Sequence, residues 1–183
     1  MRPDLLFVHG AVLWWQERVA VLAASAGTGK STLAFAALHH GLEYFSDELA
    51  PIDVHRLTVH PYPRSIYLKT PPPHPYVLPR GAIDHGGSFH LPTQAPASAH
   101  RDCEAPLAAM IFLRRDGGVG NGFRQISAAS GATYLVANTL NLLAHPAAGL
   151  EPASLVSLAV PCFELDTSDL AAASGAVRDV LSR

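Results

Sequence analysis

The residues of this chain best suited to chemistry form a glycine-rich run that ends in lysine and serine. The run spans residues 24–31 and reads ASAGTGKS. In such a loop the glycines let backbone N–H groups converge on phosphate oxygens, Lys30 reaches the β- and γ-phosphates, and the Ser31 hydroxyl joins the shell of Mg²⁺. The run therefore predicts a nucleotide-binding loop. The predicted nucleotide-binding residues are Ser25, Ala26, Gly27, Thr28, Gly29, Lys30, Ser31 and Thr32.

The segments on either side of this run provide the context that a phosphate-binding loop requires. Residues 18–23 (RVAVLA) predict a strand, and residues 31–40 predict a helix that ends at Gly41. The amino end of that helix adds a partial positive charge where phosphate would bind. Ala24 stands where the usual pattern has glycine, and alanine is compatible with that position when φ is negative.

A carboxylate suited to this chemistry follows the next predicted strand, at residues 43–45. Asp47 lies seventeen residues after Lys30. In an α/β sheet, strand carboxyl ends share the edge where the phosphate loop sits, which would place Asp47 beside the γ-phosphate. There it would accept a proton from an attacking hydroxyl or hold Mg²⁺ through water. Its alternative role is to cap the following turn. Glu48 is a weaker candidate acid, and Asp53 is weaker still.

Basic residues at predicted strand ends are candidates for contact with phosphate or substrate. Arg64 and Lys69 flank the strand predicted at residues 65–69, where a fixed cation would stabilise charge that develops on a transferred phosphoryl group. Arg114 and Arg115 follow a later apolar strand. The alternative for each of them is ordinary solvated charge at a strand end.

Composition narrows the classes of function. The chain has 183 residues, of which 49% are hydrophobic and 15% charged, so it should fold as one domain, residues 1–183. The net charge is −2 without a basic stripe, so nucleic acid is not the expected partner. Cys103 and Cys162 suit a reducing compartment. Neither a long apolar span nor a leader peptide is evident, so we expect no membrane association and a cytoplasmic location.

The hydrophobic patterns predict alternating strands and helices around the loop. Predicted strands occupy residues 5–9, 11–15, 18–23, 43–45, 49–53, 57–60, 65–69, 108–113 and 162–165. Besides the helix at 31–40, a helix is predicted at 128–143 with Ser127 as its cap, and another is predicted to run from a Ser168 cap to about residue 181. Residues 70–106 are rich in proline and histidine and predict a long loop over the site, strand-like only at 89–91. Its histidines match no tight metal-binding pattern, so zinc is not expected.

Together these residues resemble the HPr serine kinase/phosphorylase superfamily, in its catalytic C-terminal domain and in the HPr kinase-related proteins. In that family a His-Gly pair precedes the loop lysine by the interval seen here from His9 to Lys30. The helix of the family ends at a glycine, as at Gly41, and an Asp-Asp pair follows, matching Asp47 and Glu48. Residues 61–69, 106–115 and 160–165 look like the shorter kinase-related branch.

This resemblance implies an α/β fold, a P-loop kinase of the HPr kinase/PEP carboxykinase-like type with a mixed sheet and flanking helices. It implies ATP- and Mg²⁺-dependent transfer of the γ-phosphoryl group to a Ser/Thr hydroxyl of a small protein or peptide. The implied catalytic residues are Asp47, His9, Lys30 and Arg64, and the implied metal ligands are Ser31, Asp47 and Glu48.

The resemblance also bears on assembly and on the reverse, phosphorylase reaction. Relatives often form homo-oligomers. The acidic segment that follows the core in true HPr kinases is not recognised here, so phosphorylase activity is not expected. A small-molecule kinase and a nucleotide-sensing module are the alternatives.

Overall fold

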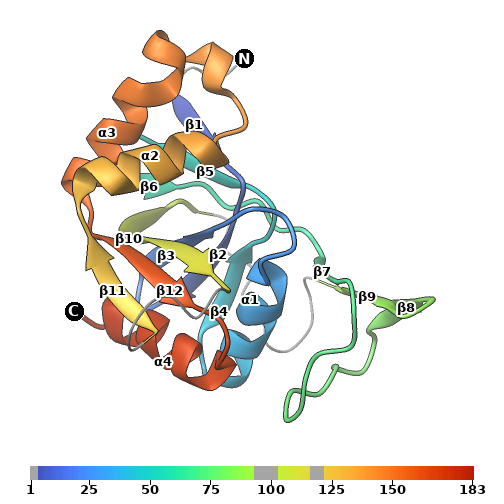
Figure 1. Ribbon diagram of the computed structural model, residues 1–183. Coiled ribbons are helices and arrows are strands. Elements are labelled where there is room, and N and C mark those ends of the chain that lie inside the picture. The colour runs from blue at the N-terminus through green and yellow to red at the C-terminus, as the bar shows by residue number, and fades with distance from the viewer. Residues whose placement is uncertain (1–3, 93–102, 116–121) are drawn as a thin grey trace.

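The computed structural model describes residues 4–92, 103–115 and 122–183, in which a mixed nine-stranded sheet forms the centre (Figure 1). Its strands follow the order β1-β5-β6-β10-β3-β2-β4, with β12 paired to β10 and β11 paired to β12. Their bounds are β1 Leu5–Val8, β2 Gly10–Trp15, β3 Arg18–Ala23, β4 Glu43–Ser46, β5 Ala50–Asp53, β6 Thr58–Val59, β10 Ala105–Arg114, β11 Phe123–Ile126 and β12 Cys162–Asp166. A smaller sheet has the order β7-β9-β8, with β7 Ile66–Leu68, β8 Ile83–His85 and β9 Ser88–Leu91.

Helices cover both faces of the large sheet. The α-helices of the described residues are α1 Lys30–His39, α2 Ala128–Asn138, α3 Leu150–Ala159 and α4 Leu170–Leu181. Along β3, Val21 packs in the layer shared with α2 and α3, and Leu22 packs in the layer shared with α1 and α4. Because both faces are buried, β3 is apolar at successive positions instead of alternating with polar residues. The predicted α/β fold with a mixed sheet and flanking helices is confirmed.

Helix α1 lies between the two sheets. Leu33 packs toward the large sheet, whereas Phe35 packs in a separate cluster with Ile66 and Leu68 of β7. The helix that follows the phosphate loop is therefore buried on two sides, and the small sheet is fixed against it.

The structure corrects the predicted helix at residues 128–143, which ends at Asn138. Thr139 adopts an extended conformation and forms a bridge with Val8. The Asn141 side chain then accepts from Phe7 N and donates to Leu5 O. These contacts with β1 therefore end the helix at Asn138. They join segments far apart in sequence, so the local sequence pattern does not predict them.

Residues 70–106 also differ from the predicted loop. β8 and β9 form a hairpin that pairs with β7, and of these two strands the sequence indicated only part of β9. The hairpin turns at Gly86 and Gly87, which both have the positive φ that a tight two-residue turn requires. β8 was missed because all three of its residues are exposed, so it has no apolar alternation. Residues 93–102 lie outside the described part of the chain.

The remaining differences are local. Helix α3 and strand β11 were not predicted, and α1 begins at Lys30, one residue before its predicted start at Ser31. The final helix is capped by Asp169, whose carboxylate accepts from the backbone N–H groups of Ala171 and Ala172, and not by Ser168. Residues 116–121, which follow Arg115, also lie outside the described part of the chain. Among the residues described, no helix has the length and apolar character needed to cross a membrane.

Replacing Gly131 with alanine is expected to destabilise the fold, because α2 lies against β12 at this glycine. A Cβ atom there would lie 2.5 Å from Cys162 Sγ and 3.0 Å from Cys162 Cβ. Overpacking of this kind costs about 1–3 kcal/mol. The matched control is Gly175→Ala in α4, where a Cβ meets nothing within 4 Å and the better helix propensity should stabilise slightly. Urea unfolding of both variants tests this, and equal effects at the two glycines would contradict it.

Candidate active site

Strand directions bring the phosphate loop and the predicted acid to one edge of the large sheet. β2 is antiparallel to both β3 and β4, so β3 and β4 point the same way with β2 between them. At the start of β2, Gly10 pairs with Ala23, which places His9 at this edge as well. β10 is parallel to β3 and ends at Arg114, so Arg115 follows at the same edge. Chain segments far apart in sequence therefore converge here.

The phosphate loop depends on glycine at two positions. Gly27 and Gly29 have φ values of 85° and 103°, in the left-handed region that other residues rarely adopt. Ala24, where the usual pattern has glycine, keeps a negative φ and is buried. Both the backbone N–H and the Oγ1 hydroxyl of Thr28 donate to Ser25 O, at 3.3 and 2.9 Å. The turn is therefore closed by its own backbone.

Lys30 is held across this loop. Its Nζ donates to Ala24 O at 2.8 Å and to Ser25 O at 3.4 Å, and the residue is 7% exposed. Burial lowers the pKa of Lys30, although the nearby charges of Asp47 and Glu48 act in the opposite direction. The ammonium group is thus poorly solvated by water, which strengthens its attraction to an anion.

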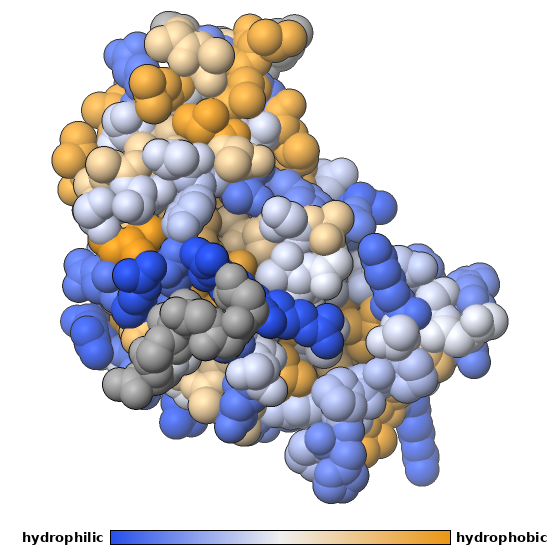
Figure 2. Space-filling model, in the orientation of Figure 1, coloured by the Kyte–Doolittle hydropathy of each residue, from blue (hydrophilic) through white to orange (hydrophobic). Residues whose placement is uncertain are grey.

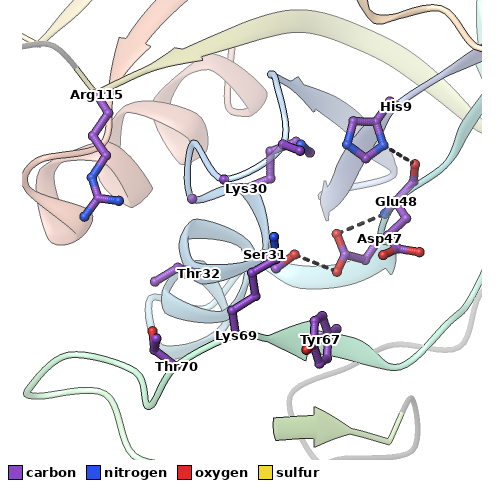
Figure 3. Close-up of a pocket in the computed structure, with 13 residues that line it drawn as sticks. His9, Lys30, Ser31, Thr32, Asp47, Glu48, Tyr67, Lys69, Thr70 and Arg115 are labelled. Atoms are coloured by element: carbon purple, nitrogen blue, oxygen red, sulfur yellow. Dashed lines mark hydrogen bonds between the residues drawn. The ribbon is translucent and has the colours of Figure 1, made fainter. Parts of the chain in front are cut away.

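Asp47, which follows β4, contacts the amino end of α1. Its Oδ2 accepts a hydrogen bond from Ser31 Oγ at 3.0 Å, and its Oδ1 accepts from Glu48 N at 3.0 Å (Figure 3). The residue is 1% exposed. Burial raises the pKa of Asp47, and the two hydrogen bonds and the Lys30 charge only partly oppose this rise. A buried carboxylate whose pKa is raised toward neutrality suits general-base chemistry.

Glu48 connects the predicted residues His9 and Arg64. His9 Nδ1 lies 3.2 Å from Glu48 O, and Arg64 Nη1 lies 2.7 Å from Glu48 Oε2. Glu48 has a φ of 69°, unusual for a residue other than glycine. The Arg64 and Glu48 side chains are 55% and 48% exposed, so this ion pair lies at the surface. Arg64 therefore stands outside the phosphate cavity, linked to it through Glu48.

A cavity of about 310 Å³ lies over the loop and gathers most of the predicted residues. Its lining residues are His9, Ala26, Gly27, Gly29, Lys30, Ser31, Thr32, Asp47, Glu48, Tyr67, Lys69, Thr70 and Arg115. Of the predicted site residues, Ser25, Thr28 and Arg64 do not line it, and neither do the further candidates Asp53 and Arg114. Tyr67 and Thr70 were not singled out in the sequence, because nothing local distinguishes them from other residues near a strand end.

The donors in this cavity fit Mg²⁺ better than a metal held by protein alone. In the described part of the chain, no group of three or more His, Cys, Asp or Glu residues is placed to bind a metal. Mg²⁺ keeps several waters and is usually held by one or two carboxylates together with substrate phosphates. The Ser31 hydroxyl and the Asp47 carboxylate, joined by a hydrogen bond, match that requirement, and Glu48 lies beside them.

A residue that the sequence analysis did not single out, Thr167, connects segments at this edge of the sheet. Thr167, which follows β12, donates from its backbone N–H to Arg114 O at 3.1 Å. Its hydroxyl lies 3.4 Å from Thr28 O and 3.3 Å from Arg114 O. This threonine therefore links the phosphate loop to the end of β10, where Arg115 begins. Such contacts between distant segments leave no sequence pattern.

A buried carboxylate fixes the same end of β10. Glu164 is 1% exposed and accepts hydrogen bonds from Tyr134 at 2.7 Å, Arg124 at 2.8 Å and Arg114 at 3.1 Å. Burial alone would raise the pKa of Glu164, but these three hydrogen bonds outweigh it and lower the pKa below its ordinary value. The cluster therefore neutralises a buried charge immediately before Arg115 enters the cavity.

Comparison with known proteins finds likeness among solved structures. No protein-family model and no curated protein matches the chain. Among solved structures, the chain is similar to the Hpr(Ser) kinase/phosphatase from Coxiella burnetii, with 14% sequence identity and a TM-score of 0.49. The alignment covers 94% of each chain.

Replacing Asp47 with asparagine is expected to stabilise the fold at neutral pH, because the native protein must bury this carboxylate. Its raised pKa means that the native state binds the proton more tightly than the unfolded chain does, so stability falls as pH rises from the ordinary value of 3.8 toward the native value. The stability gap between Asp47→Asn and wild type should therefore open over this range and then level off.

Thermal unfolding from about pH 4 to about pH 8 measures this gap. Each kcal/mol corresponds to roughly 2–4 °C in Tm for a chain of this size. Asp53→Asn is the control, because Asp53 lies at the end of β5 and its carboxylate accepts only from the exposed N–H groups of His55 and Arg56 among the bonds described. A gap that closes as pH rises would contradict the burial penalty.

Proposed function

We propose that this protein is a kinase that transfers the γ-phosphoryl group of ATP, with Mg²⁺, to a serine or threonine hydroxyl of a peptide or small protein. The observation that carries the proposal is the hydrogen bond from Ser31 Oγ to Asp47 Oδ2 at the amino end of α1. It joins the hydroxyl that the loop sequence assigns to Mg²⁺ with a buried carboxylate that can accept a proton.

The phosphates would lie in the cavity over the loop. Gly27 and Gly29 line it, and Lys30, Lys69 and Arg115 line it from separate segments. The backbone N–H groups of the loop would then bind phosphate oxygens. Cations distributed around a triphosphate stabilise both the bound nucleotide and the charge that spreads over the transferred group. Because positioning and charge stabilisation supply most of the rate in phosphoryl transfer, such a lining suits the reaction.

Mg²⁺ would be held by Ser31 and by the carboxylates of Asp47 and Glu48, together with phosphate oxygens and water. When bound, the ion neutralises phosphate charge and orients the γ-phosphoryl group. Hard oxygen donors of this kind are the ligands that Mg²⁺ prefers.

Asp47 would act as the base in the transfer step. The acceptor oxygen bonds to the γ-phosphorus while the bond from that phosphorus to the β,γ-bridging oxygen breaks. The electron pair of the broken bond leaves with ADP, and the hydroxyl proton passes to the Asp47 carboxylate. His9 lines the same cavity and would flank the reacting group, and Arg64 would contribute positive charge from the rim.

Variants of Lys30 and Asp47 should separate binding from chemistry. We expect Lys30→Ala to weaken binding of ATP with Mg²⁺ by about tenfold or more, because the cavity loses its poorly solvated cation. Asp47→Asn should keep nucleotide binding within a few fold and slow transfer by roughly 10²–10⁴. Asp53→Asn, a carboxylate outside the cavity, should change neither.

Calorimetry with ATP and Mg²⁺ measures binding, and mass spectrometry of candidate peptides and small proteins measures transfer. Unchanged transfer in Asp47→Asn would contradict its role as base. Nucleotide binding without any modified acceptor would favour a nucleotide-sensing module, and phosphorylation of a small metabolite instead of a peptide would favour a small-molecule kinase.

A further inference from the structure

A second cavity adjoins the phosphate cavity and is larger, with a volume of about 550 Å³. Its lining residues are Glu48, Pro63, Arg64, Ser65, Tyr67, Ser88 and His90. Glu48 and Tyr67 line both cavities, so the two spaces share a boundary. Most of its lining residues are polar.

The shared boundary lies on the side of the site where phosphoryl transfer would occur. In Figure 3, Glu48 and Tyr67 lie on the same side as Asp47, whereas Arg115 lies on the opposite side of Lys30. Asp47, whose carboxylate would take the acceptor proton, lines the phosphate cavity next to Glu48, one of the two residues that the cavities share. A hydroxyl that entered from the second cavity would pass Glu48 and Tyr67 to reach Asp47, and the nucleotide would occupy the remaining space toward Arg115.

The outer wall of this cavity is one face of the small sheet. Across its strands, the rings of Tyr67 and His90 lie 4.8 Å apart, and the rings of His90 and His85 lie 5.3 Å apart. The hairpin that carries the two histidines is closed by hydrogen bonds from Gly87 N to Asp84 and from Ser88 Oγ to His85 O. The opposite face of β7 is anchored in the core against α1. The aromatic row is thus a defined surface that begins at the phosphate cavity.

The shape and exposure of this surface fit a polypeptide better than a metabolite. Small-molecule pockets are mostly apolar and bury most of their ligand. Here Pro63, Arg64 and Ser65 are exposed, and the hairpin projects from the body of the molecule (Figure 1). Figure 2 shows pale, mixed-polarity side chains over this projecting part and orange ones at the far end of the molecule. An extended chain can lie along such an open wall and contact its rings and hydroxyl groups.

We propose that the cavity between Arg64, Tyr67, Ser88 and His90 is the acceptor site, and that it binds an extended polypeptide segment whose serine or threonine side chain passes between Glu48 and Tyr67 to Asp47. This inference rests on the proposed kinase function. The bonds that form and break are those of that reaction: acceptor oxygen to γ-phosphorus, with ADP as leaving group and the proton on Asp47. The side chains of the Arg64–Glu48 ion pair at the rim are each about half exposed, so an entering segment would contact them without opening the core.

A tethered acceptor tests this proposal although the natural sequence of the acceptor is undetermined. Cys103 is exposed and is replaced by serine, which leaves the buried Cys162. Ser88→Cys then provides an anchor in the cavity, to which peptides with one serine and glycine spacers of several lengths are joined by a disulfide. Tethering raises the effective concentration of the serine to the millimolar range and removes the need for intrinsic affinity. Ser182→Cys, exposed near the carboxyl end of α4 and away from the small sheet, is the matched control anchor.

After addition of ATP and Mg²⁺, mass spectrometry of the released peptides gives the result. We expect at least about tenfold more phosphoserine from the Ser88→Cys anchor than from the Ser182→Cys anchor at the best spacer length. Adding Asp47→Asn should remove it. Ser65→Cys, which also lines the cavity, is a second anchor that should give the same excess of phosphoserine, and it replaces Ser88→Cys if thermal unfolding shows that Ser88→Cys folds poorly.

The outcomes separate this inference from the function on which it rests. Equal phosphorylation from both anchors, or none from either cavity anchor in protein that binds ATP and hydrolyses it, would overturn the acceptor site and leave the kinase proposal standing. Phosphorylation of free serine or glycerol in place of every tethered peptide would overturn the polypeptide class. Failure of the unmodified protein to bind ATP with Mg²⁺ would instead overturn the proposed function.

Discussion

The site depends on the position of β2 between β3 and β4. Because β2 is antiparallel to both neighbours, the two strands that precede the phosphate loop and Asp47 point in the same direction. Had β4 paired directly with β3 as an antiparallel neighbour, Asp47 would lie at the opposite edge. At about 3.3 Å per residue, the length of β3 would then separate it from Ser31 by roughly 20 Å. The Ser31–Asp47 hydrogen bond exists because one strand intervenes.

This arrangement places opposite charges where solvation is poor. Lys30 and Asp47 are both almost inaccessible to solvent, and burial shifts the pKa of each toward its neutral form. Buried ionisable groups of this kind destabilise the fold, but they interact strongly with a charged ligand. The positive φ of Glu48 is a further local strain at the same point. The large sheet, covered on both faces, provides the compensating stability.

Helix α1 links the two cavities mechanically. It begins at the end of the phosphate loop, and it packs the buried Phe35 against Ile66 and Leu68 of β7. Since β7 also carries Tyr67, the wall shared by the cavities is fixed to the helix that positions Lys30 and Ser31. Sites built on packed elements hold their geometry better than sites built on loops.

The sequence by itself determined the features whose causes are local. The loop of residues 24–31 could be predicted because Gly27 and Gly29 are needed at specific backbone conformations, and the strand before it and the helix after it follow from apolar patterning. Asp47 could be placed at the loop because strand ends in this class of fold share an edge, and it does lie there.

Only the tertiary structure decided the rest. It turned Arg64 outward onto Glu48, brought Tyr67 and Thr70 into the phosphate cavity, and assembled β8 from exposed residues. It also ended α2 at Asn138 by pairing Thr139 with Val8. Each of these outcomes depends on contacts between segments distant in sequence, and the energy of such contacts is set by packing and hydrogen bonding that no local pattern encodes.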